Sequence, residues 1–148
     1  MRQQKMRQIR RLLITMVCLC MAFLAVPTTA HAAKTRYYDG VLRPSYDGGI
    51  AKYSKCKIKG NTVTISGKLD QFNSKSAFKH YRVATTVRMK NKKFKLTSKT
   101  AFKTIASDTG KTKSLNRSEA LKWMKTAGSI GMSLKVTGKT IKIVYFHS

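Results

Sequence analysis

Apolar and polar residues alternate with a period of two from Tyr53 onward, which is the pattern of β-strands with one buried face. The apolar positions of the first two runs are Cys56, Ile58, Val63, Ile65 and Leu69. Gly60 and Asn61 stand between these runs as a two-residue hairpin loop. The pattern therefore predicts a β-hairpin with Cys56 on its inner face. The lysines between the apolar residues, which then point outward, are Lys55, Lys57 and Lys59.

A third alternating run follows a polar loop at residues 70–80. One face of this run holds Tyr81, Val83, Thr85, Val87 and Met89, and the other holds Arg82, Ala84, Thr86, Arg88 and Lys90. Asn91 and Lys92 predict a turn into another strand that contains Phe94 and Leu96. We expect a short extended segment at residues 100–105.

One segment has helical signals instead. Asn116 is a good N-cap residue, and Glu119 follows three positions later as in a capping box. Gly128 is suited to the left-handed position at a helix C-terminus. The sequence therefore predicts a helix over residues 117–127, with Trp123 bordering its buried side.

The chain closes on a second hairpin pattern. Its alternating apolar positions are Ile130, Met132, Leu134, Val136, Ile141, Ile143 and Tyr145. Gly138 and Lys139 stand between the two runs as the turn. Five or six strands with local connections and one late helix predict a mainly β fold: a single small antiparallel sheet or a small barrel.

This order of elements resembles small secreted bacterial proteins of the oligonucleotide/oligosaccharide-binding (OB) barrel type. The resemblance covers residues 53–147 and rests on the strand order and on the helix before the C-terminal hairpin. It implies an OB-like barrel of 5–6 strands. It does not transfer an activity, because one fold serves many functions.

The residues before this domain predict a leader and an arm. Residues 1–32 contain a basic start, an apolar run of about 15 residues and the A-x-A sequence Ala30, His31, Ala32, the layout of a cleaved signal peptide. A retained anchor is the alternative, but the apolar run is shorter than the roughly 20 residues that span a bilayer. We expect residues 33–52 to form an irregular arm, with turns at Asp39 and Gly40 and at Asp47 and Gly48. The domain then covers residues 53–148.

The cysteine content indicates where the protein is located. Cys56 is the one cysteine outside the leader, so no internal disulfide is expected. An exported domain without a disulfide suggests the exterior of a Gram-positive bacterium. We therefore expect a secreted or cell-wall-associated protein that is monomeric and has no membrane span after cleavage.

The net charge of the chain is the strongest indication of its binding partner. The chain has 31 lysine and arginine residues against five aspartate and glutamate residues, a formal net charge of +26. Five of these cations lie in the leader, so the rest of the chain keeps about +21, which attracts polyanions. Most of the cations are lysine, which binds phosphate as a point charge, whereas reading of bases favours arginine. We expect an anionic envelope polymer, teichoic-acid-like, or another polyanion as the partner, and no sequence-specific nucleic acid.

The expected binding face is the outer side of the third run and its turn, beside the first hairpin. The candidate residues are Lys57, Lys59, Lys68, Arg82, Arg88, Lys90, Lys92, Lys93 and Lys95.

Two kinds of small hydrolase are the alternative. Arg117, Glu119 and His147 supply the residue types of small microbial ribonucleases, although Glu119 falls in the predicted helix and His147 is expected at a frayed end. Cys56 with His80 or His147 supplies those of a cysteine-dependent cell-wall enzyme. Strand parity directs the neighbouring lysines away from the thiol, which favours a buried, inert Cys56.

No cluster of ligating residues has the spacing of a metal site, and we expect neither a metal nor another cofactor. A third function class is an antimicrobial protein, toxin or inhibitor, which would need an exposed apolar patch or a basic amphipathic helix. The sequence therefore favours a secreted, non-enzymatic β-domain that binds anionic envelope polymers.

Overall fold

The computed structural model describes residues 32–46, 48–106 and 109–147. The predicted signal peptide lies outside the described residues except for Ala32. The elements are β1 (Thr35–Leu42), β2 (Lys52–Lys59), β3 (Thr62–Phe72), α2 (Lys75–Lys79), β4 (Thr85–Lys95), β5 (Ala101–Ile105), β6 (Thr112–Ser114), α3 (Arg117–Thr126), β7 (Ile130–Thr137) and β8 (Thr140–His147).

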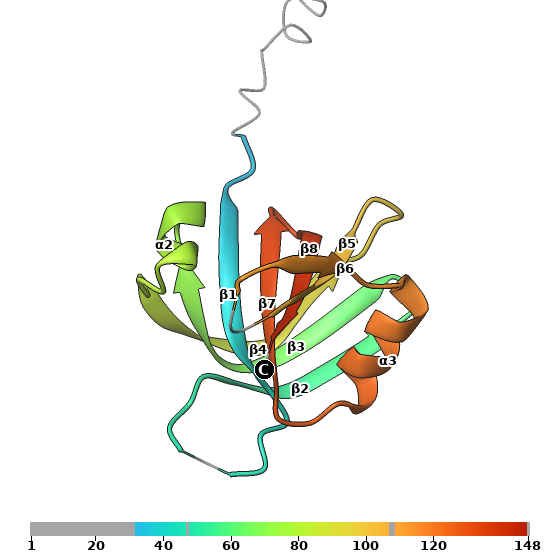
Figure 1. Cartoon of the computed structure of the whole chain (residues 1–148), viewed down its shortest axis with the longest axis horizontal. Coiled ribbons are helices and arrows are strands. Elements are labelled where there is room, and N and C mark those ends of the chain that lie inside the picture. The colour runs from blue at the N-terminus through green and yellow to red at the C-terminus, as the bar shows by residue number, and fades with distance from the viewer. Residues whose placement is uncertain (1–31, 47, 107–108, 148) are drawn as a thin grey trace, which may run out of the picture. The chain divides into compact units, whose positions relative to one another are not determined.

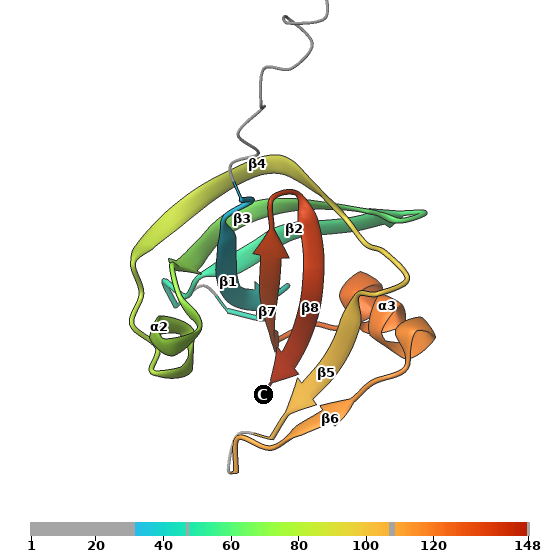
Figure 2. The same cartoon turned by 90° about the horizontal axis from the view of Figure 1, so that it is seen from above.

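The strands form one sheet in the order β4-β3-β2-β1-β7-β8-β5-β6 (Figure 1). Strand β4, at one end of this order, also pairs with β8 through Lys95 and Thr140, so the sheet curls round (Figure 2). The predicted mainly β fold is confirmed. The expected five or six antiparallel strands are wrong, because the described residues form eight, and β1–β2 and β5–β8 are parallel pairs.

Strand β1 corrects the expectation of an irregular arm at residues 33–52. It pairs with β7 along its whole length, from Thr35 opposite Thr137 to Leu42 opposite Ile130. Its middle residues are all buried, and a strand covered on both faces shows no period of two. Gly40 is needed for close packing, not for a turn, since a Cβ there would meet the Leu69 side chain at 2.8 Å.

Both predicted hairpins and the predicted helix are confirmed. Strands β2 and β3 pair on either side of Gly60 and Asn61, and β7 and β8 pair on either side of Gly138 and Lys139. The Asn116 side chain caps α3 by accepting a hydrogen bond from the Ser118 N–H. The helix ends differently from the expectation: Ala127 is its C-cap in extended conformation, and the positive φ of 54° lies at Ser129, not at Gly128.

The segment between β3 and β5 differs most from the alternating pattern. The expected polar loop contains the short helix α2, which Ser74 caps by accepting from the Ala77 N–H. Strand β4 does not turn at Asn91 but runs on to Lys95, because Asn91 takes a positive φ of 49° within a β-bulge. Tyr81 precedes β4 and is exposed.

The core lies on the inner side of the curl. It includes Tyr38, Leu42, Tyr53, Cys56, Val63, Ile65, Leu69, Phe94, Leu96, Met132, Leu134, Ile141, Val144 and Phe146. Helix α3 adds Ala120 and Met124 to this core and packs against β2 and β5. Figures 1 and 2 show α2 on the opposite side of the domain from α3.

Arg43 fixes the chain after β1 to the C-terminal end of α3. Its guanidinium donates to the backbone carbonyl oxygens of Trp123, Met124 and Ala127, at 2.9 to 3.3 Å. Carbonyl groups at a helix C-terminus lack partners within the helix and carry partial negative charge, so a cation stabilises them. This arginine therefore has a structural role.

Candidate functional site: the outer face of strands β2 to β4

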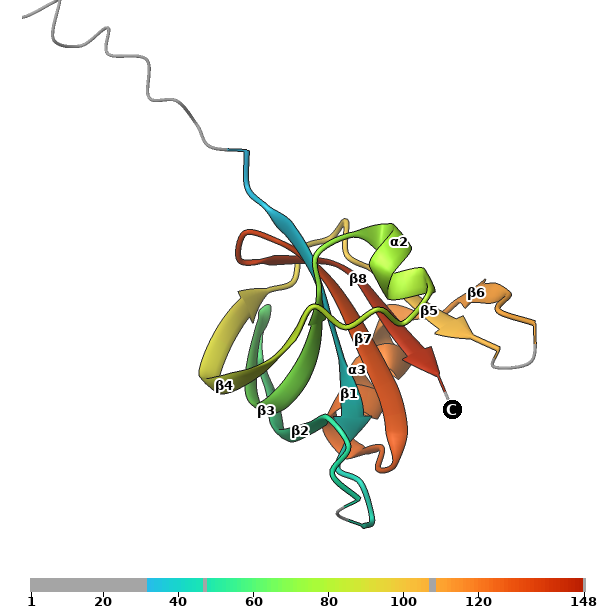
Figure 3. The same cartoon turned by 90° about the vertical axis from the view of Figure 1, so that its left-hand side faces the viewer.

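Strands β2, β3 and β4 lie side by side, apart from the β5–β6 hairpin (Figure 3). Cross-strand partners share a face, and the buried partners on the inner face are Cys56, Ile65, Val63 and Phe94. The opposite, outer face carries rows of cations. Written from β2 through β3 to β4, three of these rows are Lys59/Thr62/Lys95, Lys57/Thr64/Lys93 and Lys52/Lys68/Arg88.

Two bulges meet at one point of β3. Strand β2 has Ser54 as an extra residue between the Tyr53 and Lys55 pairings, and β4 has an extra residue opposite Ser66. The Ser66 hydroxyl donates to the Asn91 side-chain oxygen at 3.1 Å and accepts from the Asn91 N–H at 2.9 Å. Bulges bend a strand and change which way its side chains point. The bulge in β2 therefore places Lys52, at an even position, on the outer face with the odd-numbered lysines.

A groove of about 640 Å³ lies at these bulges. Its polar lining includes Lys52, Ser54, Ser66, Lys68, Arg88, Lys90 and Asn91. Within the described residues, the side chains of Lys68, Arg88 and Lys90 have no hydrogen-bond or carboxylate partner. Lys68 stands directly opposite Arg88, and like charges in that position destabilise a sheet. A bound anion would remove this repulsion.

Seven of the nine cations predicted for the binding face share it: Lys57, Lys59, Lys68, Arg88, Lys90, Lys93 and Lys95. Lys92 pairs with the buried Ile65 and so has the parity of the inner face. Arg82 lies in the loop before β4, where its N–H bonds to the Ala77 carbonyl. These two residues do not belong to the outer face.

Lys52 and Lys55 were missing from the predicted set. The parity of the first hairpin already directed Lys55 outward, and it pairs with Ser66 in the middle of the face. Lys52 could not be found from parity, because the bulge at Ser54 reverses it. That bulge has no strong local signal in the sequence.

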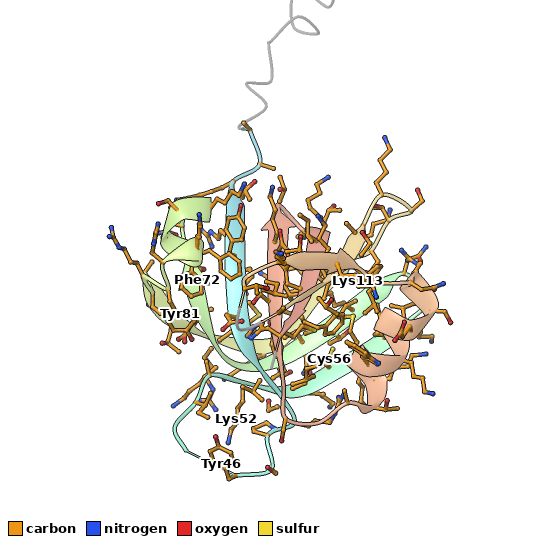
Figure 4. The ribbon with its side chains drawn as sticks, in the orientation of Figure 1. Tyr46, Lys52, Cys56, Phe72, Tyr81 and Lys113 are labelled. Carbon is orange, nitrogen blue, oxygen red and sulfur yellow. The ribbon has the colours of Figure 1, made fainter. Side chains whose placement is uncertain are left out.

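Cys56 is buried, as predicted, with 8% of its surface exposed (Figure 4). Burial raises the pKa of its thiol to about 11, although Arg43 acts in the opposite direction. Among the described residues it forms no hydrogen bond with His80 or His147. A protonated thiol inside the core is a poor nucleophile.

The ribonuclease-type residues are not brought together. Arg117 donates to the Thr97 carbonyl and to the Asn61 side-chain oxygen, at 2.9 and 3.3 Å. Glu119 is exposed in the first turn of α3. The His147 ring bonds instead to Asp39 and Ser133.

The expectation of a frayed end at His147 is wrong, because β8 holds it between β7 and β5. Its Nε2 lies 3.0 Å from Asp39 Oδ1 and 3.1 Å from Ser133 Oγ. Ser133 is 1% exposed and its hydroxyl donates to Asp39 Oδ1 at 2.6 Å. In a catalytic relay the histidine uses its two nitrogens for different partners and the serine faces substrate. This cluster is therefore a partly buried polar network that joins β1, β7 and β8.

A second carboxylate lies beside this network. Asp70 on β3 is the cross-strand partner of Asp39, and the Tyr81 hydroxyl donates to both carboxylates, at 3.2 Å to Asp70 and 3.5 Å to Asp39. Burial and the two carboxylates raise the pKa of Tyr81 to about 12. Figure 4 shows Tyr81 next to Phe72, whose ring it meets edge-on. Sequence reasoning assigned Asp39 to a turn and missed this cluster.

Comparisons with known proteins add no relative. A scan of protein-family models finds no match, and searches of curated proteins and of solved structures find no match either. The resemblance to OB-type proteins stays a prediction. In the part of the chain that the structure describes, no helix is long and apolar enough to cross a membrane, and no group of three or more His, Cys, Asp or Glu residues is placed to hold a metal ion.

Proposed function

We propose that the protein is a non-enzymatic, secreted domain that binds anionic cell-envelope polymers of the teichoic-acid type through the outer face of β2 to β4. The observation that carries this proposal is the placement of Lys68 directly opposite Arg88, inside a groove that also holds Lys52 and Lys90. Folding alone does not favour this arrangement, because adjacent like charges repel.

Protection of a sheet edge is the simpler explanation for lysines on strands, since charged residues keep edges from pairing with other chains. It fits β4, which lies at one end of the strand order. It does not fit Lys68, because β3 has a paired neighbour on each side. Lys68, at the centre of the groove, therefore needs another reason, and anion binding supplies one.

The chemistry of these cations indicates the kind of anion. All of those in the groove are lysine except Arg88. Lysine attracts phosphate as a flexible point charge and does not read the edges of bases. Phosphate-rich polymers of the envelope satisfy this preference without any sequence readout.

Binding of this kind is measured by retention on isolated cell walls or on an immobilised polyphosphate. We expect retention at low salt and release at a few tenths molar salt, where the screening length falls to several Å. The double variant Lys68→Gln/Arg88→Gln should elute at clearly lower salt. The control Lys113→Gln/Lys142→Gln removes the same charge from exposed sites on β6 and β8. Equal elution of the two variants, or retention in molar salt, would contradict the proposal.

A further inference from the structure

The outer face of β3 has a floor of small hydroxyl residues between two lines of cations. Thr62, Thr64 and Ser66 occupy consecutive outer positions of β3, two residues apart. On the β2 side they pair with Lys59, Lys57 and Lys55. On the β4 side they face Lys95, Lys93 and the bulged pair Lys90 and Asn91. Lys68 follows, with Lys52 and Arg88 as its partners.

We call this feature the lysine track: the floor residues Thr62, Thr64, Ser66 and Lys68 with their outward-facing partners on β2 and β4. Neighbouring strands lie about 4.8 Å apart, so the two lines of cations start about 10 Å apart at the backbone. Rows two residues apart recur about every 6.7 Å along a strand. Four rows therefore cover roughly 20 Å along β3.

The two ends of the track differ. One end is at Gly60 and Asn61, the exposed turn of the β2–β3 hairpin. At the other end the next outer position of β3 is Asp70, which pairs with Asp39. A negatively charged ligand is attracted by the four rows from Thr62 to Lys68 and repelled by the carboxylates of the next row, Asp70 and Asp39. The track therefore has a defined length.

We propose that the lysine track holds one extended, unbranched poly(polyol phosphate) chain along β3, with about four of its phosphates between the two lines of cations. This inference rests on the proposed function and specifies its ligand. The chain lies over the hydroxyl floor, where Thr62 and Thr64 can donate to phosphate oxygens and accept from polyol hydroxyls. The Ser66 hydroxyl is already bonded to Asn91. Lysines on both sides reach the same phosphate because their stems are long and flexible.

The track favours a polyol phosphate over a single-stranded nucleic acid, although both are phosphodiester chains. Proteins that bind single strands without sequence preference stack the bases on aromatic side chains. The track's floor and sides consist of Thr, Ser, Asn, Lys and Arg. The nearest outer aromatic residue of β3 is Phe72, which lies beyond Asp70 and is fully buried. Within the track itself, bases would therefore find no aromatic side chain to stack on, whereas a polyol needs none.

The test measures the affinity of the full domain for oligo(glycerol phosphate) of one, two, four, six and eight units. Affinity should rise steeply up to about four phosphates and level off beyond that length, and the slope of log K against log salt should approach roughly −3. Oligothymidylates of equal charge should bind at least several-fold more weakly. The variant Lys57→Gln/Lys93→Gln should lose the gain between two and four units and keep the binding of two units in the groove. The control is again Lys113→Gln/Lys142→Gln.

The outcomes separate this inference from the proposed function. If no anionic polymer binds at all, the proposed function fails. If polymers bind, their affinity could instead keep rising with length and be weakened equally by Lys57→Gln/Lys93→Gln and Lys113→Gln/Lys142→Gln. The net charge of the whole protein would then account for binding, and the lysine track would be refuted. Oligothymidylates that bind as well as the polyol phosphates of equal charge would refute the choice of ligand.

Discussion

Gly67 lies against the backbone of Lys52, at the point where both neighbours of β3 carry a bulge. It has a φ of 143°, and a Cβ built there would collide with the Lys52 carbonyl oxygen. The bend that shapes the basic groove therefore depends on the missing side chain at this position.

Gly67→Ala should destabilise the domain by at least about 2 kcal/mol, because it adds a backbone clash to an unfavourable φ. Gly60→Ala is the matched control: Gly60 also has a positive φ, of 54°, but nothing lies within 4 Å of its Cβ position. That change should cost about 1 kcal/mol. Urea unfolding measures both, and equal losses would show that Gly67 is not tightly packed.

Neutralising Lys68 should stabilise the free protein while it weakens binding. Lys68→Thr removes a like charge from between Lys52 and Arg88 and puts a β-branched residue in a strand, so we expect a gain of a few tenths of a kcal/mol. The polymer affinity of the same variant should fall several-fold. Denaturant unfolding and a binding titration check the two effects, and a variant that is both less stable and unchanged in affinity would assign Lys68 to the fold alone.

Asp39→Asn should destabilise the protein more than Asp70→Asn does. Asp39 is 5% exposed and accepts from the buried Ser133 hydroxyl, with His147 against the same oxygen. Weakening these bonds inside the sheet should cost about 1–3 kcal/mol. Asp70 accepts hydrogen bonds from Thr86 and Tyr81 near solvent, where water can replace the lost partner. Asp70→Asn should therefore lower the free energy of unfolding by less than about 1 kcal/mol. Equal losses in thermal unfolding would contradict a role for the Asp39 network in holding β8.

The free energy of unfolding should decrease at alkaline pH because the buried Cys56 thiol has a raised pKa. Its folded pKa of about 11 lies above the ordinary thiol pKa of 9.0, so between these values the folded state binds more protons than the unfolded state. The contribution of the thiol is therefore fully present below about pH 9 and is lost as pH rises to about 11, with a size of order 3 kcal/mol. Cys56→Ala should flatten this part of the pH profile. A thiol that reacts with reagent at pH 8 in the native protein would contradict its burial.

The sequence predicted the strands in which apolar residues alternate with polar or small ones. Strands β2, β3 and β8 alternate because one face is more buried than the other. Strand β7 is buried on both faces from Gly131 to Leu134, but it keeps the pattern because Gly131 and Ser133 are small or polar. Strand β1 is buried on both sides, so Tyr38, Asp39 and Gly40 were interpreted as a turn. The same error hid the Asp39 network, whose members come from three strands that are distant in the sequence.

Most of the basic face was predictable for the same reason. Lysines at alternate positions of β2 and β4 point outward by parity, and pairing β4 beside β3 brings them together. Parity missed Lys52, because the bulge at Ser54 intervenes. It wrongly included Arg82, because β4 begins only at Thr85. Lys92 was included as part of an expected turn, but the strand continues through it and it has the parity of the inner face.

A titration of isotope-labelled protein with oligo(glycerol phosphate) of four units, followed by the backbone amide resonances, tests the central claim most directly. The largest shifts should fall on the lysine track, at Lys57, Thr64, Ser66, Lys68, Arg88 and Lys93, and they should disappear on addition of molar salt. Amides of α3 and of the β5–β6 hairpin should stay unchanged. Shifts centred on those elements, or spread evenly over all exposed lysines, would contradict a binding face on β2 to β4.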